Sequence, residues 1–237
     1  MPLPTINKPT FETTLPSNGT KIEFRPFLVG EEKILLTAKE SGDRIDLIRA
    51  IRQVVQNCVL TDPFNSETIT TFDLEWLFIQ LRAKSVNNIV EIRLQDEDDG
   101  EEYTLEVDLD KVEIINEVKT NKVELVEEQP LGMIIHFPTP KISEELKDIQ
   151  SLHEVTYQLI ISCIQEVYDE DNVYPWNENT QKEKEKWIDS LSVESYDKLR
   201  EFFLNMPRLF LEVSYTNSEE KEKKLTFQTL DDFFSWD

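Results

Sequence analysis

The side chains that could support chemistry in this sequence are two histidines, two cysteines and a run of carboxylates. His153 precedes Glu154 on a predicted helix, as in a zinc protease, but Tyr157 stands where the second imidazole ligand is required. His136 lies in an alternating apolar run, which is typical of a side chain on the face of a sheet. We therefore predict neither a zinc site nor a catalytic histidine.

The remaining reactive groups also lack the spacing that catalysis or cofactor binding requires. Cys58 and Cys163 each lie in an apolar helical pattern, which predicts buried, reduced thiols. The five glycines are not spaced as a phosphate-binding loop or a dinucleotide fingerprint. If the acidic run of residues 96–102 were a calcium loop with Gly100 at its sixth position, Gln95 would be the first ligand, which is a poor one. We expect no enzyme activity, no cofactor and no metal, and a solvated loop at residues 96–102.

Composition narrows the class of partner. The chain has 237 residues, with 25 Lys and Arg against 48 Asp and Glu, and its formal net charge is −23. A protein surface with this excess of negative charge repels nucleic acids and anionic membranes, so we expect neither as a partner. Aromatic residues make up 10% of the chain, which favours a folded protein. The start of the sequence has no signal-peptide pattern and no stretch reaches a membrane-spanning length, so we expect a cytosolic protein.

The pattern of the sequence predicts an α+β fold in three segments. Residues 1–88 are electrically almost neutral, with 10 basic and 11 acidic side chains, and should contain a hairpin of residues 11–15 and 21–24 around Asn18 and Gly19. Three helices should follow, the second beginning at Asp43 and the third capped by Thr71 or Asp73.

The other two segments are acidic. Residues 89–137 should form a small, mostly antiparallel sheet, with strands at 89–94, 103–107, 122–126 and 131–137. Residues 138–237 should be mainly helical and end in a hairpin and a short helix, either as a separate unit or as one compact unit with residues 1–88. Within this segment, an apolar stripe from Leu152 to Val167 predicts a buried central helix.

Several motifs carry a resemblance to a known family. The sequences RPFL and EEKILL lie within residues 25–36, and TFDLEWLF and LRAKSV lie within residues 71–86. LREFFLNMP at residues 199–207 and LDDFF at residues 230–234 add to this pattern. With these motifs the chain resembles the baseplate hub subunit and assembly protein family of T-even-like contractile-tailed phages. Some relatives in this family carry closely spaced cysteines at the positions of residues 96–100 and 217–222, which imply a zinc site in those proteins. This chain has no cysteine at these positions, so we expect it to fold without metal.

The resemblance implies a non-enzymatic phage tail protein that acts in the host cytoplasm. It would assist assembly of the baseplate central hub by binding other phage tail or baseplate hub proteins, for example as an assembly chaperone. The alternative is a permanent structural subunit of the hub in the virion. The oligomeric state does not follow from the sequence.

The near-neutral N-terminal segment is where we expect the main protein contact, because it repels other acidic tail proteins least. Aromatic and arginine side chains commonly anchor interfaces. The candidate residues are Arg25, Pro26, Phe27, Trp76, Arg82 and Lys84. The alternative is that the aromatic residues belong to the core and that the two cations at the helix end only complement the helix dipole.

A second candidate surface is the C-terminal aromatic segment with Phe233, Phe234 and Trp236. It could dock in a groove of another protein or against its own domain.

Overall fold

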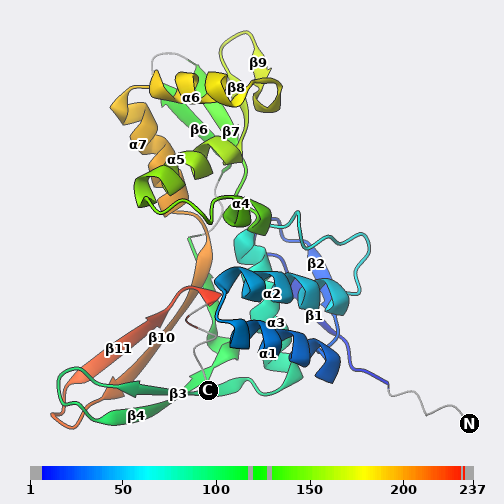
Figure 1. The fold of residues 1–237 in the computed structure, drawn as a ribbon, viewed down its shortest axis with the longest axis vertical. Coiled ribbons are helices and arrows are strands. Elements are labelled where there is room, and N and C mark those ends of the chain that lie inside the picture. The colour runs from blue at the N-terminus through cyan, green and yellow to red at the C-terminus, as the bar shows by residue number, and fades with distance from the viewer. Residues whose placement is uncertain (1–6, 117–119, 127–129, 231, 233–237) are drawn as a thin grey trace, which may run out of the picture. The chain divides into compact units, whose positions relative to one another are not determined.

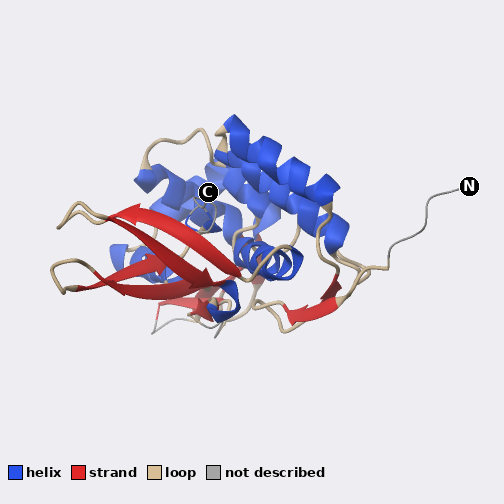
Figure 2. Ribbon diagram, turned by 90° about the horizontal axis from the view of Figure 1, so that it is seen from below, coloured by secondary structure: helices blue, strands red, loops and turns tan. Residues whose placement is uncertain are grey.

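The computed structural model describes the whole chain except residues 1–6, 117–119, 127–129, 231 and 233–237. The α+β class predicted from the sequence is confirmed, since helices are combined with small antiparallel sheets (Figures 1 and 2). The chain forms two compact units. The discontinuous unit consists of Met1–Ile115 and Pro207–Asp237, and the inserted unit is Asn116–Met206. These units do not follow the three segments expected from composition, because one unit interrupts the other.

The discontinuous unit begins with a hairpin and three helices. The elements are β1 (Phe11–Thr14), β2 (Lys21–Phe24), α1 (Val29–Ser41), α2 (Arg44–Cys58) and α3 (Thr71–Ser85). Gly42 ends α1 in the left-handed region with φ 68°, and the Asp43 side chain then caps α2 by accepting a hydrogen bond from the Ile45 amide at 2.7 Å. The apolar faces of α2 and α3 pack with Phe24 in one core cluster.

Two local predictions in this unit need correction. A two-residue hairpin turn would require positive φ at both Asn18 and Gly19, but only Gly19 has it, at 73°. The loop is longer, and Leu15 and Thr20 close it through a 2.8 Å backbone hydrogen bond. The cap of α3 is Thr70, not Thr71 or Asp73. Asp73 is instead buried, and its carboxylate accepts a hydrogen bond from the Ser17 amide at 3.0 Å.

Two long hairpins complete the discontinuous unit. They are formed by β3 (Ile89–Gln95) with β4 (Glu102–Asp108), and by β10 (Arg208–Thr216) with β11 (Glu222–Phe227). The 3₁₀ turn Leu109–Lys111 leads from the first hairpin to β5 (Glu113–Ile115), which adds to the free edge of β10. The inward faces of the hairpins share one apolar core, and their strands lie close together in both views (Figures 1 and 2).

The inserted unit has a four-stranded antiparallel sheet in the order β6-β7-β8-β9. The strands are β6 (Lys122–Val126), β7 (Leu131–Ile135), β8 (Ile164–Tyr168) and β9 (Val173–Pro175). The helices are α4 (Pro140–Glu145), α5 (Leu152–Cys163), α6 (Gln181–Asp189) and α7 (Val193–Leu204), with a 3₁₀ turn at Trp176–Glu178. Their apolar faces and the sheet form a separate core.

The structure corrects two larger expectations. The predicted helix over Leu152 to Val167 ends at Cys163, and the chain passes directly into β8. Ile164 and Val167 are still buried, but as strand residues, and Val167 lies opposite Met133 of β7. The strands expected to form one sheet over residues 89–137 are also divided, because β3 and β4 belong to one unit and β6 and β7 to the other.

Candidate binding surfaces

Arg25 is held inside the discontinuous unit. Its guanidinium donates to Glu31 Oε1 at 2.9 Å and to the Asn57 carbonyl at 3.0 Å, and the side chains of Arg25 and Glu31 are only 15% and 12% exposed. Burial alone would raise the pKa of Glu31, but the hydrogen bond from Arg25 and a second one from the Leu28 amide hold it below its ordinary value. Arg25 therefore joins the end of β2 to the start of α1.

The neighbouring aromatic candidates are also partly or fully enclosed. Phe27 is buried in the core cluster of α1, α2 and α3, and Pro26 is half-buried. Trp76 is half-buried, and its indole N–H donates to the Thr13 hydroxyl at 3.0 Å.

The two cations at the end of α3 are more accessible. Lys84 forms a 2.9 Å ion pair with Asp110, in which both side chains remain partly exposed. Arg82 is half-buried, and desolvation lowers its pKa while nearby Glu32 opposes that shift. The structure thus does not collect the six candidate residues on one exposed surface. Phe233, Phe234 and Trp236 lie outside the described residues.

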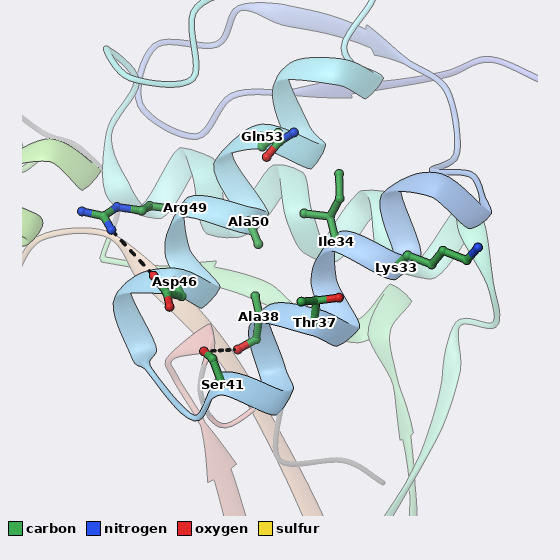
Figure 3. Close-up of a pocket in the computed structure, with 9 residues that line it drawn as sticks. All are labelled: Lys33, Ile34, Thr37, Ala38, Ser41, Asp46, Arg49, Ala50 and Gln53. Carbon is green, nitrogen blue, oxygen red and sulfur yellow. Dashed lines mark hydrogen bonds and ion pairs between the residues drawn. The ribbon is translucent and has the colours of Figure 1, made fainter.

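A groove that the sequence analysis missed lies between α1 and α2 (Figure 3). Its volume is about 490 Å³. The lining residues are Lys33, Ile34, Thr37, Ala38 and Ser41 from α1, and Asp46, Arg49, Ala50 and Gln53 from α2. Small side chains at helical spacing on α1 are a weak trace of the groove in the sequence, but they do not predict it by themselves because the second wall comes from α2.

The sequence predicted a solvated loop at residues 96–102, but in the structure side chains of this loop are hydrogen-bonded to the other long hairpin. Tyr215, on the other long hairpin, donates to Asp96 at 2.6 Å, and Asp96 is only 3% exposed. Asp99 accepts hydrogen bonds from the hydroxyl of Tyr103 at 2.6 Å and from that of Ser218 at 2.7 Å. These five residues form the tip network, which joins the ends of the two hairpins.

The tip network shifts the acidity of its members. The hydrogen bond to Asp96 raises the pKa of Tyr215 to about 12, and the hydrogen bond from Tyr103 holds the pKa of Asp99 far below its usual range. The tyrosines stay protonated and the aspartates stay ionised near neutral pH. The network therefore links one hairpin to the other through side-chain hydrogen bonds.

The reactive groups singled out from the sequence lie apart from one another. His153 is exposed on the first turn of α5, and His136 is half-buried, with Nδ1 3.1 Å from the Phe137 carbonyl oxygen. Cys58 and Cys163 are buried free thiols, as predicted, and burial raises their pKa values to about 11 and about 12. Within the described ranges, no three His, Cys, Asp or Glu side chains are grouped so that they could hold a metal ion. Among the helices in those ranges, none has the length and apolar character needed to cross a bilayer.

The sequence of the chain matches the model of a known protein family. A family model described as T4 bacteriophage base plate protein matches residues 8–235. No curated protein and no solved structure matches the chain.

Proposed function

The chain belongs to the T4 bacteriophage base plate protein family, and on this basis we propose that it acts in assembly of the baseplate central hub by binding other tail proteins. The observation that carries the proposal is the extent of the family match, which covers residues 8–235. The family indicates a structural or assembly role in the phage tail. The narrower assignment to the hub is supported by the resemblance of the RPFL, EEKILL and LRAKSV motifs.

A temporary role as an assembly chaperone suits the charge of the molecule. A net charge of −23 keeps a protein soluble and opposes self-association, which helps to hold an assembly intermediate in solution until it is displaced. In this role the chain would act in the host cytoplasm and leave before the particle is complete. The competing function is a permanent hub subunit, which the family description supports equally well.

Co-expression tests the proposal. The chain is produced together with the hub and tape-measure proteins of its phage, and the mixture is separated by size exclusion. We expect the chain to elute in a complex with at least one of them, and elution of the chain alone in every combination contradicts a hub-assembly role. Mass spectrometry of purified particles then distinguishes the two functions, because a chaperone is absent from them and a permanent subunit is present in fixed proportion.

A further inference from the structure

The outer edge of β4 carries backbone groups that no other described strand uses. Among the described strands, β4 pairs only with β3 (Figure 1). The Asp96 amide donates to the Glu101 carbonyl at 2.9 Å and closes this ladder at the tip. Because alternate residues of a strand direct their backbone groups to the same side, the odd-numbered residues of β4 bond to β3. The N–H and C=O groups of Glu102, Thr104 and Glu106 therefore point away from β3.

Other strand edges of the molecule are covered or protected, as is usual in natural sheets. The segment after α2 lies along the edge of β2, since the Leu60 amide donates to the Glu23 carbonyl at 2.8 Å. α7 lies against β6, where the Ser195 hydroxyl donates to the Leu125 carbonyl at 3.0 Å. β11 carries Lys224 in its interior, a residue type that disfavours edge pairing. By contrast, β4 is seven residues long and contains neither proline nor lysine, so its edge can accept another strand.

The solvent face of the β3–β4 hairpin is acidic. It carries three exposed carboxylates, Glu91, Glu102 and Glu106, and one cation, Arg93, which lies on β3. Glu91 lies directly opposite Glu106, an arrangement that destabilises a sheet. Within the described part of the chain, none of the three carboxylates forms an ion pair. Two lysines near the ends of the hairpin already pair with aspartates. The charged side chains nearest the free edge of β4 are therefore both negative.

From these features we propose that the outer edge of β4 binds an extended, basic segment of another tail protein as an added strand. Backbone hydrogen bonds to residues 102, 104 and 106 would supply affinity. Lysine or arginine would lie beside Glu102 and Glu106 on the solvent face, and apolar residues would lie beside Leu105 on the buried face. This inference rests on the proposed function, since it identifies a surface through which the chain would bind its partner.

A pair of proline variants tests the edge in the co-expression experiment with the hub and tape-measure proteins. Thr104 and Arg93 lie opposite each other, and each directs its N–H away from the neighbouring strand. Proline at such a position removes no hydrogen bond of the ladder, so both variants should fold, which circular dichroism and the melting temperature verify. We expect Thr104→Pro to weaken the complex by about tenfold or more, and Arg93→Pro by less than about twofold. Equal losses would overturn the inference.

A second pair tests charge. Glu106→Lys and Glu91→Lys each remove the like-charge pair, so both should raise the melting temperature slightly. An added strand would lie about 5 Å from β4 and about 10 Å from β3. We therefore expect Glu106→Lys to weaken the complex more than Glu91→Lys, with a difference that shrinks as salt is added. A complex that neither variant weakens would contradict a basic partner.

Hydrogen exchange reads out the added strand directly. In the free chain the amides of Glu102, Thr104 and Glu106 should exchange fast, and in the complex they should be protected by about tenfold or more. The amide of Leu105, which faces β3, should change little on binding. Protection that is absent from the three outer amides would overturn strand addition.

A photo-crosslinking residue at position 104 identifies the occupant. The proposal predicts crosslinks to a partner segment in which lysine or arginine alternates with apolar residues. Crosslinks to a helix or to a second copy of this chain overturn it. A complex that forms and is unaffected by Thr104→Pro also overturns it while leaving the proposed function intact, and absence of any complex removes both.

Discussion

Replacing Gly132 by alanine tests the packing of the sheet in the inserted unit. Gly132 lies on β7, directly opposite Tyr168 of β8. A Cβ at this position would overlap the Tyr168 hydroxyl and would lie 2.7 Å from the carbonyl oxygen of Val123, a backbone atom that no rotamer change can move. The Tyr168 ring also lies under the Lys122 ammonium, 4.5 Å from its nitrogen, so moving the ring disturbs a second contact.

The expected magnitude follows from two opposing effects. Forcing an extra methyl into a packed site costs about 1–3 kcal/mol. Alanine also lowers the conformational entropy of the unfolded chain relative to glycine, which stabilises the folded state by about 0.4–1 kcal/mol. The net destabilisation should be about 1–2 kcal/mol, which for a unit of about 90 residues lowers the melting temperature by roughly 5–15 °C.

A matched substitution gives the control. Gly30→Ala on α1 adds the same methyl where no atom from outside the helix lies within 4 Å; alanine stabilises the middle of a helix by roughly 0.5–1 kcal/mol relative to glycine, and in the first turn, where Gly30 lies, we expect a smaller gain. The two variants should therefore shift thermal unfolding in opposite directions. Hydrogen exchange should be faster in β7 and β8 for Gly132→Ala only. A melting temperature for Gly132→Ala equal to or above that of the native sequence would refute the reasoning.

Three further outcomes are expected. Asp43→Ala removes the cap of α2 and should cost about 1 kcal/mol in denaturant unfolding, whereas Asp43→Asn should cost much less because it still accepts the hydrogen bond; equal losses would contradict the cap. Tyr215→Phe removes the donor to Asp96 and should speed hydrogen exchange at both hairpin tips without changing the circular dichroism spectrum; unchanged exchange there would show that the tip network does not hold the tips together. Burial raises the pKa of Cys58 to about 11 and of Cys163 to about 12. The neutral form of each thiol therefore stabilises the folded state, and this contribution to the free energy of unfolding should decline as pH rises from about 8.5, the pKa of an unfolded cysteine, toward these values. Alkylation at pH 8.5 should accordingly be slow until denaturant is added, and rapid labelling of the native protein would disprove the burial of the thiols.

The sequence predicted the elements whose signals are local. The hairpin around Gly19 and the hairpin around Gly100 were placed correctly because each loop needs one residue in the left-handed region, and glycine adopts it without strain. The start of α2 was correct because Asp43 immediately precedes an apolar stripe. The predicted length of the turn at Gly19 was wrong because the backbone hydrogen bond that closes the loop, between Leu15 and Thr20 next to the strand ends, leaves no trace in the hydropathy pattern.

The features that depend on distant residues were not predictable in this way. Ile164 and Val167 continue the helical stripe of α5 in sequence, but β7 offers them hydrogen-bonding partners and so converts residues 164–168 into a strand. The burial of Asp96 requires Tyr215, which is far away in sequence. The groove was missed because its two walls come from different helices, and only their packing creates the space between Ala38 and Ala50.

The insertion of one unit within the other has a kinetic consequence. β5 and β10 pair through Ile115 and Arg208, so the discontinuous unit must close a loop of about 90 residues before these strands can meet. If the inserted unit folds first, it draws its two ends together, and the side chain of Asn116 then lies 3.4 Å from the Met206 carbonyl. Shortening the effective loop from about 90 residues to about five lowers the entropic barrier by roughly 2–3 kcal/mol. With that order of folding, residues 116–206 would speed the pairing of the strands on either side of them.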